Sequence, residues 1–187
     1  DISSLTSPLV VLHFNLSPNA PRDRTQDPEL GRLSRKVRHV NLMPADMVTP
    51  VLVIHGGAGS KAPTKEQRRI YYASLKRILD DVYPHLLRGE SAVKCAVLAV
   101  ELLENDPLYN AGKGSKIQSD GKIRMSASLM DGHKRRFSGC VNVEGVKNPI
   151  RLAEALQNKE DRVLGGRGAR AFAKEIGLEF ASPYTKK

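Results

Sequence analysis

The sequence predicts a mixed α/β (α+β) protein in which one short strand is followed by two helices, three strands and two further helices. Apolar residues recur at helical spacing between residues 65 and 103. Apolar runs separated by Asp-Gly pairs, which are typical of hairpin turns, follow between residues 116 and 146. The 187 residues are enough for one domain of ordinary size.

The first part of this order contains a strand and two helices. Residues 51–55 are predicted to be a short buried strand. A helix is expected over residues 65–87, ending near Gly89, and Ser91 is a suitable N-cap for a second helix that ends before Pro107. The apolar residues that predict the two helices are Ile70, Leu75, Ile78, Leu79 and Val82 in the first, and Val93, Val97, Val100 and Leu103 in the second.

The second part contains three strands and two helices. Two strands are expected around the Asp-Gly pair at Asp120, and a second Asp-Gly turn leads to a third strand over residues 136–146. Pro149 suits the first turn of a helix that extends over residues 150–156. A last helix is expected over residues 168–176, where Gly177 ends it.

Residues 1–46 differ in composition from the rest of the chain. Prolines recur, charges of both signs alternate, and no helical or strand period extends beyond one short apolar run. Either these residues form a disordered extension, or they are translated upstream sequence with no structural role, since Met47 looks like a natural start. The expected organisation is therefore an extension over 1–46 and a folded part over 47–187.

Composition argues against several classes of protein. No apolar run approaches the ~18 residues of a membrane-spanning helix, so no membrane partner is expected. Cys95 and Cys140 are expected to be core residues rather than nucleophiles, and two cysteines make no disulfide framework, which favours a cytoplasmic protein. The net charge of +10 raises nucleic-acid binding as an alternative. Aromatic residues are only 5% and the basic residues are spread along the chain, so that alternative is not favoured.

Three glycine-rich segments invite comparison with nucleotide-binding loops. They are "HGGAGSK", "NAGKGS" and "GGRGAR", and none has the spacing of a Walker loop or of a complete dinucleotide fingerprint. The five histidines are scattered, with no pair at i, i+4 and none close to a cysteine, so a zinc site is not expected.

Five segments in a fixed order do resemble one family. They are "IHGGAGS", "LLENDPLYNAGKGS", "IRMSASLMDG", "SGCVNVEGVKNPIRLA" and "VLGGRGARAFAKEIG". Together they resemble the plant-type L-asparaginases, or isoaspartyl peptidases, which are threonine-dependent N-terminal-nucleophile hydrolases. The resemblance extends from Val51 to about Leu178. It implies a four-layer αββα sandwich, with helices covering two facing sheets, that is incomplete without a second portion of the enzyme.

The resemblance also implies a site. In that family the glycine segment after the first strand lies beside the catalytic threonine, and the matching residues here are His55, Gly56, Gly57, Ala58 and Gly59. Glycine lets backbone amides lie close to a reacting centre. The alternative is an ordinary tight turn between a strand and a helix.

Two further features follow from the same resemblance. Asn110 matches an asparagine that helps to hold the amino group of the nucleophile, since a side-chain amide oxygen can accept from an amine. The loop around it matches one that binds a structural sodium ion, with no other cofactor implied; an ordinary irregular loop is the alternative. The matching ligands are the main-chain carbonyls of Leu103, Glu104, Asp106, Tyr109, Ala111 and Lys113.

The sequence departs from the family pattern at two points. Ser126 stands where the family usually has an acidic residue, which changes the local hydrogen bonding. The family's threonine nucleophile, in a Gly-Thr-Val-Gly context, has no counterpart among the threonines of this chain. That chemistry needs a threonine at a chain terminus, where its own α-amine is the base for its hydroxyl.

The resemblance therefore implies an α portion whose partner is a β portion carrying the threonine, in an (αβ)2 assembly that acts on asparagine and β-aspartyl peptides. The isolated chain is expected to be inactive and poorly soluble, because strand edges and apolar faces would lie open. The alternative is a non-catalytic, truncated relative that acts as an interaction module.

Overall fold

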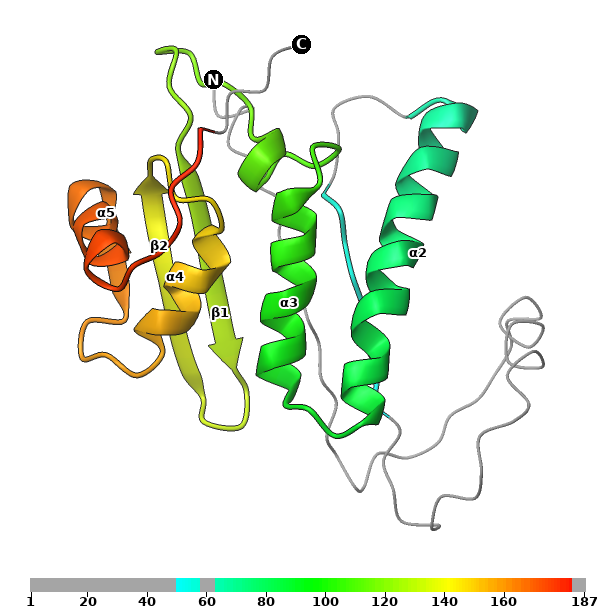
Figure 1. The fold of residues 1–187 in the computed structure, drawn as a ribbon, viewed down its shortest axis with the longest axis horizontal. Helices are drawn as coiled ribbons and strands as arrows, with labels where there is room; N and C mark the ends of the chain where they lie inside the picture. The colour runs from blue at the N-terminus through cyan, green and yellow to red at the C-terminus, as the bar shows by residue number, and fades with distance from the viewer. Residues whose placement is uncertain (1–49, 58–62, 183–187) are drawn as a thin grey trace. The chain divides into compact units, whose positions relative to one another are not determined.

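The computed structural model describes residues 50–57 and 63–182, and from Leu52 onward they belong to one compact unit (Figure 1). The predicted extension over residues 1–46 lies outside the described residues, as do Ala58 and Gly59. The elements are α2 (Lys65–Leu87), α3 (Ala92–Asn105), the 3-10 turn η2 (Gly112–Gly114), β1 (Met125–Asp131), β2 (Arg136–Val143), α4 (Pro149–Leu156), β3 (Val163–Gly165) and α5 (Gly166–Glu175).

The two long helices begin where the sequence places capping residues. The Thr64 hydroxyl accepts a hydrogen bond from the Gln67 backbone N–H, and the Gln67 side chain accepts one from the Thr64 N–H, at 3.2 and 2.9 Å. The Ser91 hydroxyl caps α3 by accepting a hydrogen bond from the Lys94 backbone N–H. The two helices pack against each other through an apolar cluster formed by Ile78, Val82, Leu86, Cys95, Ala99, Leu103 and Tyr109.

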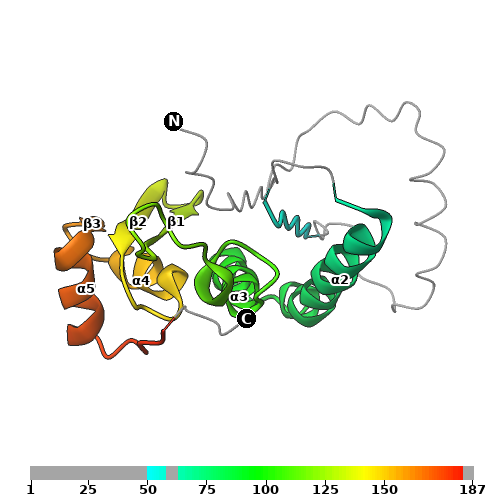
Figure 2. The same ribbon diagram turned by 90° about the horizontal axis from the view of Figure 1, so that it is seen from above.

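The strands form one small sheet in the order β1-β2-β3. Strands β1 and β2 are antiparallel, and β3 is parallel to β2. Helices α4 and α5 lie on one face of this sheet (Figure 2). The core between them consists of Ile123, Met125, Cys140, Val143, Val146, Leu152, Leu156, Ala169 and Ala173.

The opposite face of the sheet carries apolar side chains that remain about half exposed. Met130 is 55% exposed, Phe137 50%, Val141 46% and Val163 51%. A soluble protein rarely leaves such residues together on one open face, since burying them would be favourable. This face is therefore ready to receive another layer.

Two of the predicted strands are absent. Residues 51–55 form no strand; Leu52 and Ile54 pack against the α2–α3 cluster, while Val53 between them is 51% exposed. Exposed and partly buried side chains alternate along this segment, as they do in a strand. A strand also needs a neighbouring strand to pair with its backbone N–H and C=O groups, and none of the described residues forms one. The predicted strand before Asp120 is also wrong, although the turn itself forms.

One short strand was not predicted. The apolar run in the three residues of β3 is too short to predict a strand from the sequence. These residues form a strand because they pair with β2. Helix α5 begins at Gly166, two residues earlier than expected, and β2 ends at Val143 rather than at Val146. The mixed α/β class is confirmed. Within the described ranges, no helix combines the length and apolar character needed to cross a membrane.

Candidate functional site

Gly56 of the glycine segment lies directly against Tyr109. A Cβ atom added to Gly56 would be 2.5 Å from Cε1 of Tyr109, far inside the distance that real side chains tolerate. Gly57 has a φ of +96°, which favours glycine, and its N–H donates to Nδ1 of His55 at 3.1 Å. The structure thus brings His55, Gly56 and Gly57 to the loop that follows α3, although the sequence separates the two.

Tyr109 is almost completely buried, with 2% of its surface exposed. Its ring centroid lies 6.1 Å from that of Tyr71 on α2, in a tilted arrangement. Its hydroxyl is buried, and this burial raises the pKa of Tyr109 against a smaller opposing effect of the Ser74 hydroxyl. The side chain therefore serves mainly as a packing surface.

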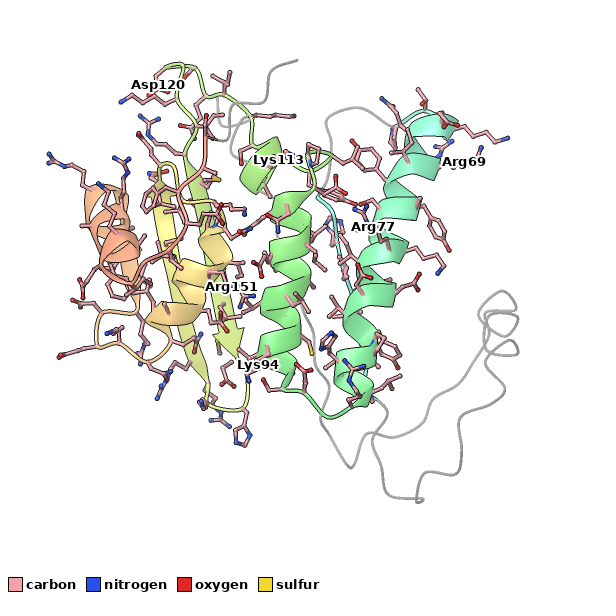
Figure 3. The ribbon with its side chains drawn as sticks, viewed as in Figure 1. Arg69, Arg77, Lys94, Lys113, Asp120 and Arg151 are labelled. Carbon is pink, nitrogen blue, oxygen red and sulfur yellow. The ribbon has the colours of Figure 1, made fainter. Side chains whose placement is uncertain are left out.

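Asp106 connects the loop to α2. Its carboxylate accepts from the Ser74 hydroxyl at 2.6 Å, from Nη2 of Arg77 at 3.1 Å and from the backbone N–H of Leu108 at 3.0 Å. Only 8% of Asp106 and 7% of Ser74 are exposed. Arg77 is one of the labelled side chains in Figure 3, and its guanidinium reaches the loop from α2. The start of the loop is therefore fixed by a buried, charge-assisted network.

Asn110 is held within the same loop. Its Oδ1 accepts a hydrogen bond from the backbone N–H of Lys116 at 2.8 Å. An amide oxygen of this kind can accept from an amine. The position is compatible with the expected contact to an amine, which stays a prediction.

The main-chain oxygens named for sodium lie in a tightly wound backbone. The carbonyls of Leu103, Asp106 and Ala111 accept loop hydrogen bonds at 3.3, 3.3 and 2.9 Å. A Cβ added to Gly112 would lie 2.2 Å from the Glu104 carbonyl oxygen, and one added to Gly114 would lie 2.1 Å from that of Tyr109. The loop is thus a narrow backbone cradle of carbonyl oxygens, which are the ligands that a hard cation prefers. Sodium binding in this cradle stays a prediction. Across the described residues, no group of three or more His, Cys, Asp or Glu could hold a metal.

Replacing Gly114 with alanine is expected to destabilise the protein by about 2 kcal/mol or more, because the new Cβ would meet backbone oxygens that cannot swing aside. Gly132→Ala is the matched control, since a Cβ there meets nothing within 4 Å. Thermal unfolding of both variants in the complete gene product would check this. Equal unfolding midpoints would contradict the tight winding of the loop.

The buried side chain of Glu104 was missed by the sequence reasoning, which named only its carbonyl. Oε1 accepts from the backbone N–H of Ile150 at the start of α4, at 3.0 Å, whereas Oε2 is buried without a hydrogen bond in the described part of the chain. Burial raises the pKa of this carboxyl to about 8, against the smaller opposing effects of the Ile150 N–H, Asn148 and Arg151. The sequence feature that could have revealed this burial is the position of Glu104 beside the apolar face of α3.

Helices α3 and α4 are also joined by polar side chains. Arg151, which is labelled in Figure 3, lies on α4 and forms an ion pair with Glu101 on α3. Nδ2 of Asn148 donates to Oδ1 of Asn105 at 3.1 Å. With the Glu104–Ile150 bond, these contacts tie the helix that precedes the loop to the helix that covers the sheet. The loop is therefore anchored on both sides.

Ser126 makes a local hydrogen bond between the two long strands. Its hydroxyl accepts from the backbone N–H of Asn142 at 3.2 Å, at the point where the β1–β2 register shifts. Asn142 has a φ of +54°, a conformation that asparagine tolerates better than most residues. The register shift between β1 and β2 is therefore stabilised by a neutral hydroxyl, at a position where the family usually has an acidic residue.

The two cysteines are core residues, as the sequence predicts. Both are free and buried, and burial raises the pKa of Cys140 to about 11. A thiol of that pKa is hardly ionised near neutral pH, so Cys140 is unsuited to act as a nucleophile.

Comparison with known proteins places these features in a family. Residues 48–187 match a family described as asparaginase. The chain is 48% identical over 138 residues to an isoaspartyl peptidase/L-asparaginase of Synechocystis, covering 74% of this chain and 42% of the relative. It is 50% identical over 131 residues to one of Nostoc (70% and 41%). It is 41% identical over 136 residues to a plant-type L-asparaginase of Pyrobaculum calidifontis (72% and 44%). The chain thus spans about two fifths of the length of these relatives.

Proposed function

This chain belongs to the asparaginase family, and from that premise we propose that it is the α portion of an enzyme that hydrolyses asparagine and β-aspartyl dipeptides. The observation that supports the proposal most strongly is the family match over residues 48–187. The names of the relatives supply the two substrate classes. Those relatives are more than twice as long as the matched segment, which supports the proposal that the remaining machinery lies in a second portion.

The proposed reaction passes through an acyl-enzyme. A threonine hydroxyl in the β portion attacks the side-chain carbonyl of the substrate, ammonia or an amino acid leaves, and water then hydrolyses the ester. The α-amine of that threonine takes the hydroxyl proton. No Gly-Thr-Val-Gly segment occurs in the 187 residues, so this chain supplies supporting groups rather than the nucleophile.

The supporting groups are those of the glycine segment and the loop. The backbone of Gly56 and Gly57 would lie beside the reacting centre, where N–H groups can stabilise a developing oxyanion. Asn110 would accept from the amine of the nucleophile through its side-chain oxygen. The carbonyl cradle over residues 103–113 would hold sodium, whose effect would be to fix the shape of the loop.

The half-exposed face of the sheet is the proposed seat of the β portion. Met130, Phe137, Val141 and Val163 offer apolar area there, on the side opposite α4 and α5. A second sheet on this face would complete the four-layer arrangement, and two such pairs would form the (αβ)2 assembly.

The test is to read the complete gene and then assay its product. We expect a segment with the Gly-Thr-Val-Gly pattern beyond residue 187, self-cleavage into two chains on a denaturing gel, and release of aspartate from a β-aspartyl dipeptide. Replacing that threonine with alanine should abolish both cleavage and hydrolysis. A complete gene that encodes no such threonine would refute the proposal. It would favour the second candidate, a non-catalytic interaction module, which the absence of the motif from these 187 residues already motivates.

A further inference from the structure

We propose that Tyr109 is a positioning residue for the glycine segment: its buried ring sets where the backbone of Gly56 and Gly57 lies relative to Asn110. This inference rests on the proposed function, in which that backbone lies beside the nucleophile. It gives a role to the side chain of Tyr109, whereas the family resemblance implies a role only for its main-chain carbonyl, as a sodium ligand.

The contact between the ring and the segment is close and one-sided. A Cβ on Gly56 would lie 2.5 Å from Cε1, 3.0 Å from Cδ1 and 3.5 Å from Cζ of Tyr109, and these are its three nearest atoms. Gly56 shows no positive φ, so alanine could adopt its backbone conformation and only the ring excludes it. The side chains of Leu52 and Ile54 pack against the same apolar cluster. The packing of Leu52 and Ile54 thus holds Gly56 against the ring of Tyr109.

The ring itself has little freedom to move away. It is 2% exposed and belongs to the cluster that joins α2 to α3, together with Ile78, Ala99 and Leu103. Its backbone N–H donates to the Asp106 carbonyl at 3.3 Å, within the loop that Ser74 and Arg77 anchor. A closely packed interior transmits a displacement instead of absorbing it. A shift of the glycine backbone is therefore the expected response to any change at this contact.

Tyr109 also immediately precedes Asn110. The ring contacts Gly56, and the next side chain along the loop is the one expected to hold the amine of the nucleophile. One residue thus sets the spacing between two parts of the candidate site that are distant in the sequence. The three atoms nearest to the Cβ position of Gly56 are all ring carbons of Tyr109, so this role belongs to the ring.

The experiment is a double-mutant cycle in the protein produced from its complete gene. The variants are Gly56→Ala, Tyr109→Leu and the two combined, with Tyr109→Phe as the conservative variant and Gly132→Ala as the control in open space. The readouts are kcat and KM for a β-aspartyl dipeptide, the fraction of self-cleaved protein, and the thermal midpoint. Because a misplacement of about 1 Å can cost about 100-fold in rate, we expect Gly56→Ala to lower kcat by 10- to 100-fold with KM changed less than about threefold.

The double variant decides the question. Removing the ring makes room for the new Cβ, so the combined variant should be faster than Gly56→Ala alone, and Tyr109→Phe should stay well above Tyr109→Leu. The proposal is overturned if Gly56→Ala has the wild-type kcat, if the two losses simply multiply, or if kcat falls only as the folded fraction does. A wild-type protein that neither self-cleaves nor hydrolyses the dipeptide refutes the proposed function, and this inference with it. Loss of coupling in an active enzyme refutes only the inference.

Discussion

Replacing Asp106 with alanine is expected to lower the free energy of unfolding by about 3 kcal/mol. The change leaves the buried Ser74 hydroxyl and the Leu108 N–H without their acceptor, each at a cost of about 1–3 kcal/mol. Arg77 adds little, because its side chain is 65% exposed and returns to water. In a domain of this size the thermal midpoint should fall by roughly 6–12 °C.

The matched control for Asp106 is Asp80→Ala on α2, the helix that carries Ser74 and Arg77. Asp80 also accepts from a basic side chain, Lys76 at 2.5 Å, but its own side chain is 60% exposed. That variant should change stability by less than about 1 kcal/mol. Ser74→Ala, which removes one donor, should lie between the two. If Asp106→Ala and Asp80→Ala have the same thermal midpoint in the complete gene product, the network does not anchor the loop.

Glu104→Gln is expected to change how stability depends on pH. In the folded protein the pKa of Glu104 is raised to about 8 by burial, whereas the unfolded chain has the ordinary value of 4.5. Between these pH values the folded protein keeps a proton on Glu104 that the unfolded chain releases. The contribution of this proton to the free energy of unfolding is therefore complete below pH 4.5 and is lost as pH rises through 8. The loss across this window is at most roughly 5 kcal/mol.

Glutamine at position 104 retains an oxygen for the Ile150 N–H but has no proton to lose. Thermal midpoints measured between pH 5 and 9 should therefore fall less steeply for Glu104→Gln than for the wild type. Glu160→Gln, at an exposed position, is the control and should follow the wild-type slope. Parallel slopes for all three proteins would show that Glu104 is ionised at neutral pH, and thus more solvated than its surroundings suggest.

The sequence predicts best what is determined locally. The bounds of α2 agree with the prediction because its start is encoded by Thr64 and Gln67, and Ser91 marks the start of α3 equally well. The segment at residues 51–55 has the alternation of a strand but lacks the neighbour that would make it one. Strand pairing depends on distant residues, and no local pattern reports whether a partner is present.

The candidate site shows the same division. The resemblance to known enzymes selected His55, Gly56, Gly57 and Asn110, and the structure brings the glycine segment onto the loop that holds Asn110. The contact of Gly56 with Tyr109 joins residues far apart in the chain, so sequence patterns do not reveal it. The anchoring by Asp106 and the buried Glu104 carboxyl are tertiary effects of the same kind, whereas their residue types alone suggest solvent exposure.

The order of the sheet has a consequence for how the chain behaves when it is produced by itself. Strands β1 and β3 form its two edges, and no strand of the described residues pairs with the outer side of β1, which is seven residues long. A free row of backbone donors and acceptors can template a strand from another molecule. Such growth would show a lag phase, seeding and cross-β dye binding, unlike amorphous clustering through the apolar face. Fibres in a preparation of this chain would then report a missing neighbouring strand, and not a defective core.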